Sequence, residues 1–461
     1  VTYPSLASAQ EDKLYIEALA LGANQVTVSG FTTPDVLVYD LRDPNDPVRL
    51  LTTAAAPTGG VYDVSFWDAD LPDPTYYLSS QGALAAPLAI EPDTPSNWRT
   101  PDHTADYIAV VHPSLWNAID PLLDYRAAQG LRVAKVDVQD IYDEWSYGRR
   151  DPEAIRSFLT YAYRCWNGGP CAAPPAMPPD PPQYVLLVGD GHYDFTGVSG
   201  TTFPNLIPPY LVHVDPWLGE ALADNRYVSA DGPDDFLPDM AIGRIPANVP
   251  ADVEAVTAKT IAYETLSPTG PWQERVVFVA DRNVDPAGDF HALSDHIRLQ
   301  WLPGGYDDRT MYYLRDYTTG PEMRAAVRSA FNDDTLLIQW FGHSSRYQWG
   351  SFVAFNVYDP PTLDPNDSWP ITTHYTCYSG YFANLAWDLH SLGEVLVGTP
   401  LRGAVADFSS AGANLGNSLL VLNAGLTQAI FRDRIDPLGQ SVDAAKLYYF
   451  ENSGGLYNVI D

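Results

Sequence analysis

The sequence predicts an α/β protein, in which mostly parallel strands are flanked by helices and preceded by an all-β domain. Three observations predict this fold class. Residues 1–100 contain short alternating strands separated by turn residues. From residue 105 onward, buried apolar strands alternate with helical segments, which is typical of a parallel sheet covered on both faces. The chain has 461 residues, more than a single hydrophobic core usually holds.

The N-terminal region, residues 1–100, predicts a sandwich-like accessory domain. Apolar and polar residues alternate in five segments, KLYIEALAL, QVTVSGF, DVLVYDL, VYDVSFW and TYYLSS. Alternation with a period of two buries one face of each strand, and two such layers can share a core. The segment PDTPSNWRTPDHT, around residues 92–104, reads as a linker to the next domain.

Two α/β subdomains are predicted after the linker, over residues 105–248 and 249–461. The first contains strands at 106–112, 132–138 and 184–190, and a helix that Asp151 caps and Pro152 begins. The second contains strands at 276–281, 335–343 and 371–377, with helices between them and a further strand and long helix after them. Functional groups of such sheets lie beyond the carboxyl ends of the strands. Four polar residues occur there: Asp190, Asp281, His343 and Cys377.

The charge balance excludes two classes of partner. The net charge is −32 and the isoelectric point about 4.3. General binding to nucleic acid or to an anionic membrane surface needs a basic footprint, which this chain lacks. No stretch approaches the roughly 18 to 20 apolar residues of a membrane span.

The three cysteines divide into a close pair and a single residue. Cys165 and Cys171 flank a Gly-Gly-Pro turn in CWNGGPC, where a disulfide or two free thiols are both compatible with the sequence. We expect the disulfide, which indicates an oxidising compartment and therefore an extracellular or cell-surface location. This pairing leaves Cys377 as a single thiol.

Cys377 and His343 form the candidate reactive pair. Each ends a predicted strand, in HYTCYSG and WFGHSS, and 34 positions separate them. If the two strands are parallel neighbours, both side chains reach the same edge of the sheet. A thiol beside an imidazole can supply a thiolate nucleophile, and the imidazole can return the proton to a leaving amine. The alternative interpretation is a packed core thiol and a structural histidine.

The motifs around these residues resemble those of the gingipain-type cysteine peptidases, which share the caspase-like fold. The resemblance rests on GHSSRYQWG and THYTCYSGYFAN and extends to LLVGDGHYD, IPPY and DNRYVSADGPDDFLPDMAIGRIPA, so it covers roughly residues 105–461. The sequence departs from the family pattern at Ser344, where a glycine is usual. The matching motif residues are Gly342, His343, Trp349, Cys377, Gly380 and Phe382.

The resemblance implies a secreted cysteine endopeptidase that acts on protein or peptide substrates. Cys377 would be the nucleophile, His343 the general acid and base, and Asp281 the carboxylate that orients the histidine. Backbone N–H groups of Gly342, Ser344 and Cys377 would form the oxyanion hole. The resemblance also implies that substrate contacts come from Asp289, Asn414 and Trp349, with a preference for a basic residue before the cleaved bond. Asp289 could equally cap the following helix.

The family resemblance also implies structural calcium. An acidic run provides oxygen ligands at Asp224, Asp231, Asp234 and Asp235, although its spacing is not that of an EF-hand and a solvated acidic loop is the alternative. Nearby, Asp239 and Arg244 are expected to form a structural pair.

Two other functions remain compatible with the sequence. One is a sorting peptidase that processes exported proteins. The other is a catalytically silent surface or scaffold protein that retains the fold. A pro-segment or a cell-surface partner is expected in addition to the substrates.

Overall fold

The computed structural model describes most of the chain, in two compact units, Val1–Thr94 and Pro95–Asp461. The described residues are 8–17, 24–43, 46–55, 57, 59–68, 75–84, 93–172, 174, 177–195, 197–215, 217–232, 235–265, 270–385, 390–454 and 459–460. Each unit has its own hydrophobic core and is described by itself.

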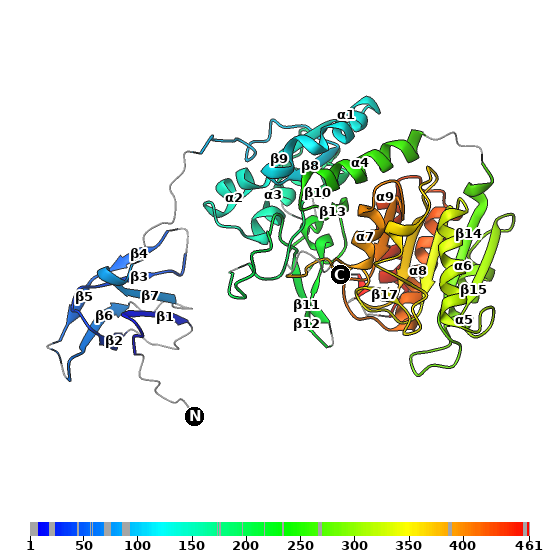
Figure 1. The fold of residues 1–461 in the computed structure, drawn as a ribbon. Coiled ribbons are helices and arrows are strands. Elements are labelled where there is room, and N and C mark those ends of the chain that lie inside the picture. Colours follow the sequence, from blue (N-terminus) through cyan, green and yellow to red (C-terminus); the bar gives the residue numbers. More distant parts are fainter. Residues whose placement is uncertain are drawn as a thin grey trace. The chain divides into compact units, whose positions relative to one another are not determined.

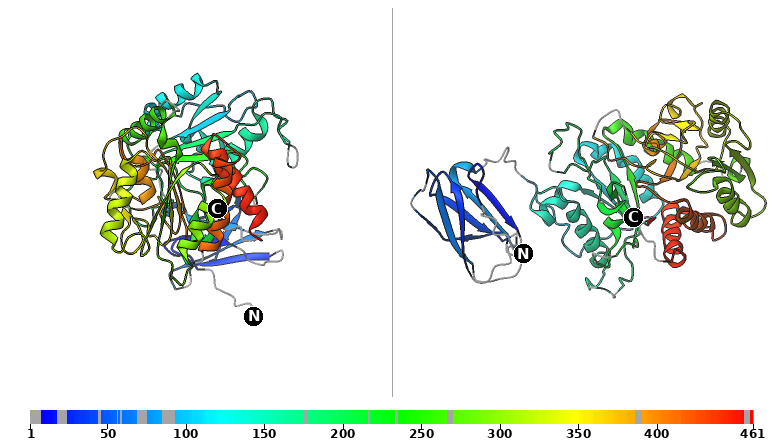
Figure 2. Two further views of the ribbon diagram at one scale, coloured as in Figure 1. Left: turned by 90° about the vertical axis from the view of Figure 1, so that its right-hand side faces the viewer. Right: turned by 90° about the horizontal axis from the view of Figure 1, so that it is seen from below.

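The first unit contains two antiparallel sheets, which confirms the predicted sandwich-like domain (Figure 2). One sheet has the order β1 (Lys13–Glu17), β7 (Thr75–Ser80), β3 (Val36–Asp40) and β4 (Val48–Leu50). The other has the order β2 (Asn24–Phe31), β6 (Tyr62–Asp68) and β5 (Thr52–Ala54). A short 3-10 helix, η1 (Gln81–Ala83), follows β7. Alternate residues from both sheets fill one core, as the period-two pattern requires.

The second unit begins with a four-stranded parallel sheet. Its order is β13 (Ala241–Ile245), β10 (Tyr184–Val188), β8 (Tyr107–Val111) and β9 (Val133–Asp137). One face packs against α2 (Val138–Ser146) and α3 (Pro152–Cys165). The other face packs against η2 (Pro113–Ile119), α1 (Asp120–Ala128) and α4 (Pro250–Thr265). Asp151 caps α3 by accepting the N–H of Glu153, as the sequence predicts.

A five-stranded parallel sheet forms the second half of this unit (Figure 1). Its order is β15 (Asp307–Tyr312), β14 (Arg275–Ala280), β16 (Leu337–Phe341), β19 (Ile371–Tyr375) and β20 (Ala406–Ser409). One face packs against α5 (Phe290–Gln300), α8 (Gly416–Phe431) and α9 (Leu438–Asn452). The other face packs against α6 (Gly320–Asn332) and α7 (Leu392–Gly398).

Two hairpins and three further short 3-10 helices complete the described part of this unit. The hairpins are β11 (Leu211–Asp215) with β12 (Gly219–Leu222), and β17 (Gln348–Trp349) with β18 (Phe355–Asn356). The 3-10 helices are η3 (Asp224–Val228), η4 (Pro271–Glu274) and η5 (Pro360–Thr362). The sequence analysis missed the strands β4, β5 and β13, the helices α2 and α9, and both hairpins. α9 lacks a capping side chain at its start, since its N-cap is Pro437.

A buried lysine joins the two halves of this unit. The Nζ of Lys259, on α4, donates hydrogen bonds to the carbonyl oxygens of Ala404, Arg402 and Leu396 at 2.8, 3.0 and 3.3 Å. Burial lowers the pKa of Lys259 to about 7. The contact fixes the end of α7 and the approach to β20 against α4.

The cysteines divide as predicted. Cys165, the last residue of α3, forms a disulfide with Cys171, and Cys377 is a free thiol. Among the described helices, none combines the length and the apolar character needed to cross a membrane.

Candidate active site

The register of two neighbouring strands brings His343 and Cys377 to one edge of the sheet. β16 and β19 are parallel, and Phe341 is the partner of Tyr375. His343 and Cys377 each lie two positions further along, and the N–H of Gly342 donates to the carbonyl of Tyr375 at 3.4 Å, which continues the pairing. Since side chains alternate along a strand, both residues face the side that Phe341 and Tyr375 face, toward α5 and α8.

The imidazole of His343 is held by two contacts. Its Nε2 lies 2.9 Å from Oδ1 of Asp285, and its ring packs edge-on against Phe290 of α5, with 5.3 Å between centroids. Nδ1 has no hydrogen-bond partner among the described residues. Burial would raise the pKa of Asp285, but the N–H of Ala287 and the imidazole of His343 outweigh it and hold that pKa below its ordinary value.

Asp281 contacts the backbone of His343 and not its ring, which differs from the expectation. Its Oδ2 accepts the N–H of His343 at 3.3 Å, and its Oδ1 accepts the N–H of Arg282 at 2.7 Å. Asp281 follows β14 directly, so its short side chain reaches only the adjacent backbone. Gly342 permits this approach, because a Cβ there would lie 2.5 Å from the Cβ of Asp281. The ring partner is Asp285, four residues later in the same loop.

The sulfur of Cys377 is half-buried and lies against Asn414. The N–H of Asn414 points to Sγ at 3.5 Å, and the carbonyl oxygen of Asn414 lies 3.6 Å from Sγ. Burial raises the pKa of the Cys377 thiol, and the negative charge of Asp215 raises it further. The N–H of Asn414 lowers this pKa, but the net shift is upward. The resting state that these contacts favour is therefore a neutral thiol.

Asp215 ties together the two loops that hold the sulfur. Its Oδ1 accepts the N–H groups of Trp217 and Leu218 at 2.8 and 2.7 Å, within the β11–β12 hairpin. Its Oδ2 accepts the N–H of Ala413 at 2.8 Å and the hydroxyl of Tyr378 at 3.0 Å. Ala413 precedes Asn414, and Tyr378 follows Cys377. The sequence analysis missed Asp215, because nothing local marks a residue whose partners lie about 160 to 200 positions away.

Of the three backbone groups predicted for an oxyanion hole, Gly342 does not fit that role. Its N–H is used by the carbonyl of Tyr375 in the sheet. The N–H groups of Ser344 and Cys377 make no hydrogen bond within the described part of the chain, so they can donate to a substrate oxygen.

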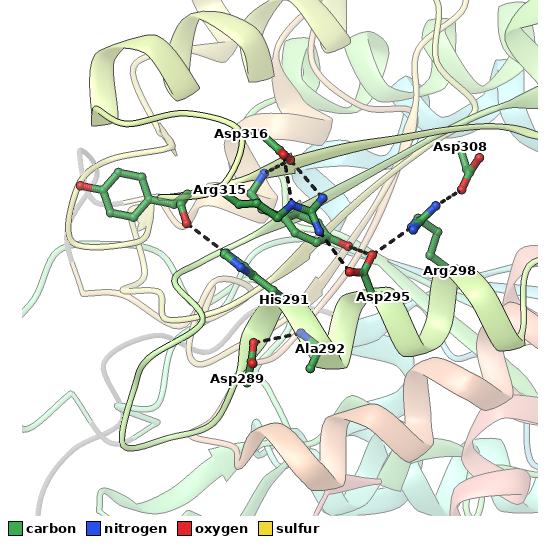
Figure 3. A network of polar contacts seen from close by, with 10 residues as sticks. Asp289, His291, Ala292, Asp295, Arg298, Asp308, Arg315 and Asp316 are labelled. Carbon is green, nitrogen blue, oxygen red and sulfur yellow. Dashed lines mark hydrogen bonds and ion pairs between the residues drawn. The ribbon is translucent and has the colours of Figure 1, made fainter.

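The three predicted substrate contacts lie in different environments. Asn414 lies beside Sγ, at the wall of a cavity of about 100 Å³ that Asp215, Tyr375, Leu419 and Lys446 also line. Figure 3 shows that Asp289 caps α5, where its Oδ1 accepts the N–H of Ala292 at 3.0 Å.

The assignment of Trp349 to substrate binding is wrong. Its side chain is fully buried and stacks on Trp340, with 5.4 Å between centroids, in the core between the sheet and the α6–α7 layer. An indole enclosed in this way cannot reach a peptide at the sheet edge, so the tryptophan of this motif belongs to the core.

The acidic run does not form one site. Asp224 pairs with the buried guanidinium of Arg244 at 2.7 Å, so the partner of Arg244 is Asp224 and not the expected Asp239. Asp231, Asp235 and Asp239 each bring a carboxylate oxygen within 4.8 Å of the others. The predicted ligand Asp234 lies outside the described residues.

A second group able to hold a cation lies between the two sheets. Asp190, His390 and Glu394 bring one ligand atom each within 4.8 Å of the others, and both carboxylates are buried. Burial and the neighbouring Glu394 raise the pKa of Asp190 to about 7. Sequence reasoning placed Asp190 at a strand end, but His390 and Glu394 join it only in the folded chain.

A comparison with sequence models of protein families identifies the family of this chain. The sequence model of peptidase family C25 matches residues 100–460, most of the chain. The chain belongs to peptidase family C25. It is a cysteine-type peptidase with the gingipain fold, as the motifs predict.

Solved structures of gingipain R and of a further protease share this fold. The Arg-specific cysteine proteinase gingipain R (RgpB) superposes with a TM-score of 0.60 at 19% identity, over 80% of this chain and 77% of that chain. The complex of the pro- and mature domains of RgpB from Porphyromonas gingivalis gives 0.59 at 19% identity, over 77% and 76%. A structure described as a protease gives 0.59 at 18% identity, over 78% and 76%. A search of curated proteins found no match.

Proposed function

We propose that this C25 peptidase is a secreted endopeptidase in which Cys377 is the nucleophile and His343 the general acid and base. The proposal rests on the register of β16 and β19. Phe341 pairs with Tyr375, and His343 and Cys377 each lie two positions beyond this pair, on the same face of the sheet. The hydrogen bond from Nε2 to Asp285 supports it, because a proton on Nε2 leaves Nδ1 as the basic nitrogen.

The reaction follows from these groups. Nδ1 of His343 takes the proton of the Cys377 thiol as Sγ attacks the carbonyl carbon of the substrate. The N–H groups of Ser344 and Cys377 donate to the oxyanion of the tetrahedral intermediate. His343 then gives its proton to the leaving amine, which leaves a thioester on Cys377. A water molecule, deprotonated by the same imidazole, hydrolyses the thioester and restores the thiol. Asp285 holds the ring and offsets its positive charge, and Asp281 fixes the backbone beneath it.

A preference for a basic residue before the cleaved bond is part of this proposal. The carboxylate of Asp289 is exposed, and only one of its oxygens is used by the helix cap, so the other is available to a substrate cation. The similar RgpB structure is described as Arg-specific. Asn414, next to Sγ, would contact the same substrate residue.

Export, a pro-segment and calcium complete the proposal. The Cys165–Cys171 disulfide favours an oxidising compartment. The RgpB complex of pro- and mature domains suggests a pro-segment as a partner for this chain also. Calcium, which prefers oxygen ligands, would be held by Asp190 and Glu394 with His390 beside them, or by the group of Asp231, Asp235 and Asp239.

A thiol-reactive peptide probe with an arginine at its reactive end tests the proposal. We expect labelling of the intact protein, loss of labelling in Cys377→Ala, and strongly reduced labelling in His343→Ala. Cleavage of a peptide library by the wild type should follow the same order. Absence of both labelling and cleavage in correctly folded protein would instead support a catalytically silent scaffold. Cleavage confined to C-terminal signals of exported proteins would indicate a sorting peptidase.

A further inference from the structure

Arg346 spans the loops that carry the two reactive residues. It lies three positions after His343, and its guanidinium stacks over the ring of Tyr381, with Cζ 3.8 Å from the centroid. Tyr381 lies four positions after Cys377. The carbonyl of Arg346 accepts the N–H of Leu392, which fixes the loop against the start of α7. The guanidinium therefore lies at the edge of the sheet where the proposed chemistry takes place.

No carboxylate neutralises this guanidinium in the described part of the chain. Its one hydrogen bond is from Nη1 to the amide oxygen of Asn384 at 2.9 Å. A guanidinium has five N–H donors in a planar fork, so several remain available. Other arginines of this acidic chain, such as Arg244 with Asp224 and Arg126 with Glu264, are paired with carboxylates. Arg346 is half-buried, which reduces the solvent screening of its charge.

Arg346 lies where the leaving segment of a substrate would pass. Asn414 and the adjacent cavity lie toward α8, which covers one face of the sheet. The backbone of Arg346 lies toward α7, which covers the other face, and its guanidinium lies on Tyr381. If the acyl part of the substrate lies beside Asn414, the leaving part extends past His343, which protonates its amine, toward Arg346.

We propose that Arg346 binds a carboxylate on the leaving segment of the substrate, either an acidic side chain or the free C-terminal carboxylate of a short segment. The inference rests on the proposed function, because it takes Cys377 and His343 as the point of cleavage. The planar fork of the guanidinium can donate two parallel hydrogen bonds to a carboxylate, and Tyr381 and Asn384 hold the fork in place.

Peptide binding to full-length Cys377→Ala protein provides the primary test. One pair of C-terminally amidated peptides carries Asp or Asn at the second position after the expected cleavage point. A second pair carries Asn at that position and ends there, with a free carboxylate or an amide. We expect the dissociation constant to be about tenfold lower for the carboxylate member of at least one pair, which corresponds to roughly 1.4 kcal/mol. The pair that shows the effect identifies the source of the carboxylate.

Variants of Arg346 connect this preference to the side chain. In the Cys377→Ala background, Arg346→Gln should bring the ratio of dissociation constants close to one, and Arg346→Lys should keep part of it, because lysine retains the charge without the fork. Arg432→Gln is the matched control. Arg432 also stacks on an aromatic ring, that of Trp301, and donates to backbone carbonyls, but it follows α8 at the opposite edge of the sheet. This control should leave the ratio unchanged.

Cleavage of the same peptides by protein with an intact Cys377 separates this inference from the proposed function. Ratios near one in both pairs, failure of all four peptides to bind, or an unchanged ratio in Arg346→Gln would overturn the role of Arg346. If the protein binds the carboxylate peptides more tightly and Arg346→Gln removes this preference, the role of Arg346 is supported, even if no peptide is cleaved. In that case the proposed endopeptidase activity is wrong and the binding site is retained.

Discussion

Nε2 of His343 lies 2.9 Å from Oδ1 of Asp285, and this contact fixes which ring nitrogen can act as a base. Asp285 is itself positioned by the N–H of Ala287, which its Oδ1 accepts at 2.9 Å. Because a carboxylate next to Nε2 keeps a proton there, Nδ1 is the nitrogen left to accept the proton of the thiol.

Replacing Asp285 should lower activity without unfolding the protein. In Asp285→Asn the side chain can still cap Ala287, but it no longer carries the charge that offsets the imidazolium. We expect kcat/KM to fall roughly 10- to 100-fold with little change in the thermal midpoint. The control is Asp151→Asn, which removes an equal charge from a carboxylate that caps α3. Wild-type activity in Asp285→Asn would assign the contact a structural role alone.

The resting state of Cys377 can be read from its alkylation. Burial raises the pKa of the thiol, so it is protonated at neutral pH and becomes a thiolate only on the alkaline side of its ordinary range. We expect the rate of reaction with iodoacetamide to rise continuously above pH 8, with no plateau near neutrality. Denatured protein is the control and should react at lower pH. A plateau between pH 6 and 7 in folded protein would indicate a resting thiolate–imidazolium pair.

The bridge that Asp215 makes should matter more for the reaction than for folding. Tyr378→Phe removes the donor to Oδ2 but leaves the three N–H contacts of the carboxylate. We expect kcat to fall several-fold, because the residue after Cys377 is less firmly held, while the thermal midpoint changes little. Tyr358→Phe alters an exposed tyrosine and serves as the control. Equal kcat for both variants would contradict a positioning role for Asp215.

Removal of the proposed calcium should destabilise the second unit. Two buried carboxylates, Asp190 and Glu394, lie close together, and a divalent cation would offset their mutual repulsion. We expect a chelator to lower the thermal midpoint by several degrees and calcium to restore it. Glu394→Gln keeps a side chain able to accept the N–H of Ser391 at the start of α7, and should reduce this response. An identical midpoint with and without the chelator would exclude a stabilising cation.

The buried Lys259 should make the unfolding free energy rise with pH. Its pKa is about 7 when folded, against 10.5 for an unperturbed lysine, so the unfolded chain binds more protons between these values. The unfolding free energy should therefore increase from pH 7 to 9, with a slope of at most about 1.4 kcal/mol per pH unit from this group. Denaturant titrations at several pH values measure this slope. Lys259→Met should reduce this slope. An unchanged slope in that variant would show that the three carbonyls keep the ammonium group charged in the folded protein.

The parts of the molecule that sequence reasoning predicted are those with local patterns. Helix α3 is predicted because Asp151 and Pro152 mark its start, and β14, β16 and β19 because each is a short run rich in apolar or β-branched residues with a polar residue after it. The order of the His343 and Cys377 motifs predicted both the family and the neighbouring strands. Asp285 could have been found, since it is an acidic residue in the same loop as Asp281.

Residues with distant partners could not be predicted. Trp349 belongs to a family motif, and only the packing against Trp340 shows that it lies in the core. The bridge from Asp215 to Tyr378, the pair of Asp224 with Arg244 and the group around Asp190 each join segments whose separation in the sequence carries no pattern.

The sequence by itself determined the alternation of strands and helices and the placement of Cys377 and His343 at strand ends. Those features depend on residue periodicity and on capping and turn residues, which act over a few positions. The tertiary structure decided which carboxylate contacts the imidazole, which N–H groups remain free and where Arg346 lies. Hydrogen bonds have a reach of about 3 Å, and only the packing of both sheets brings those atoms within it.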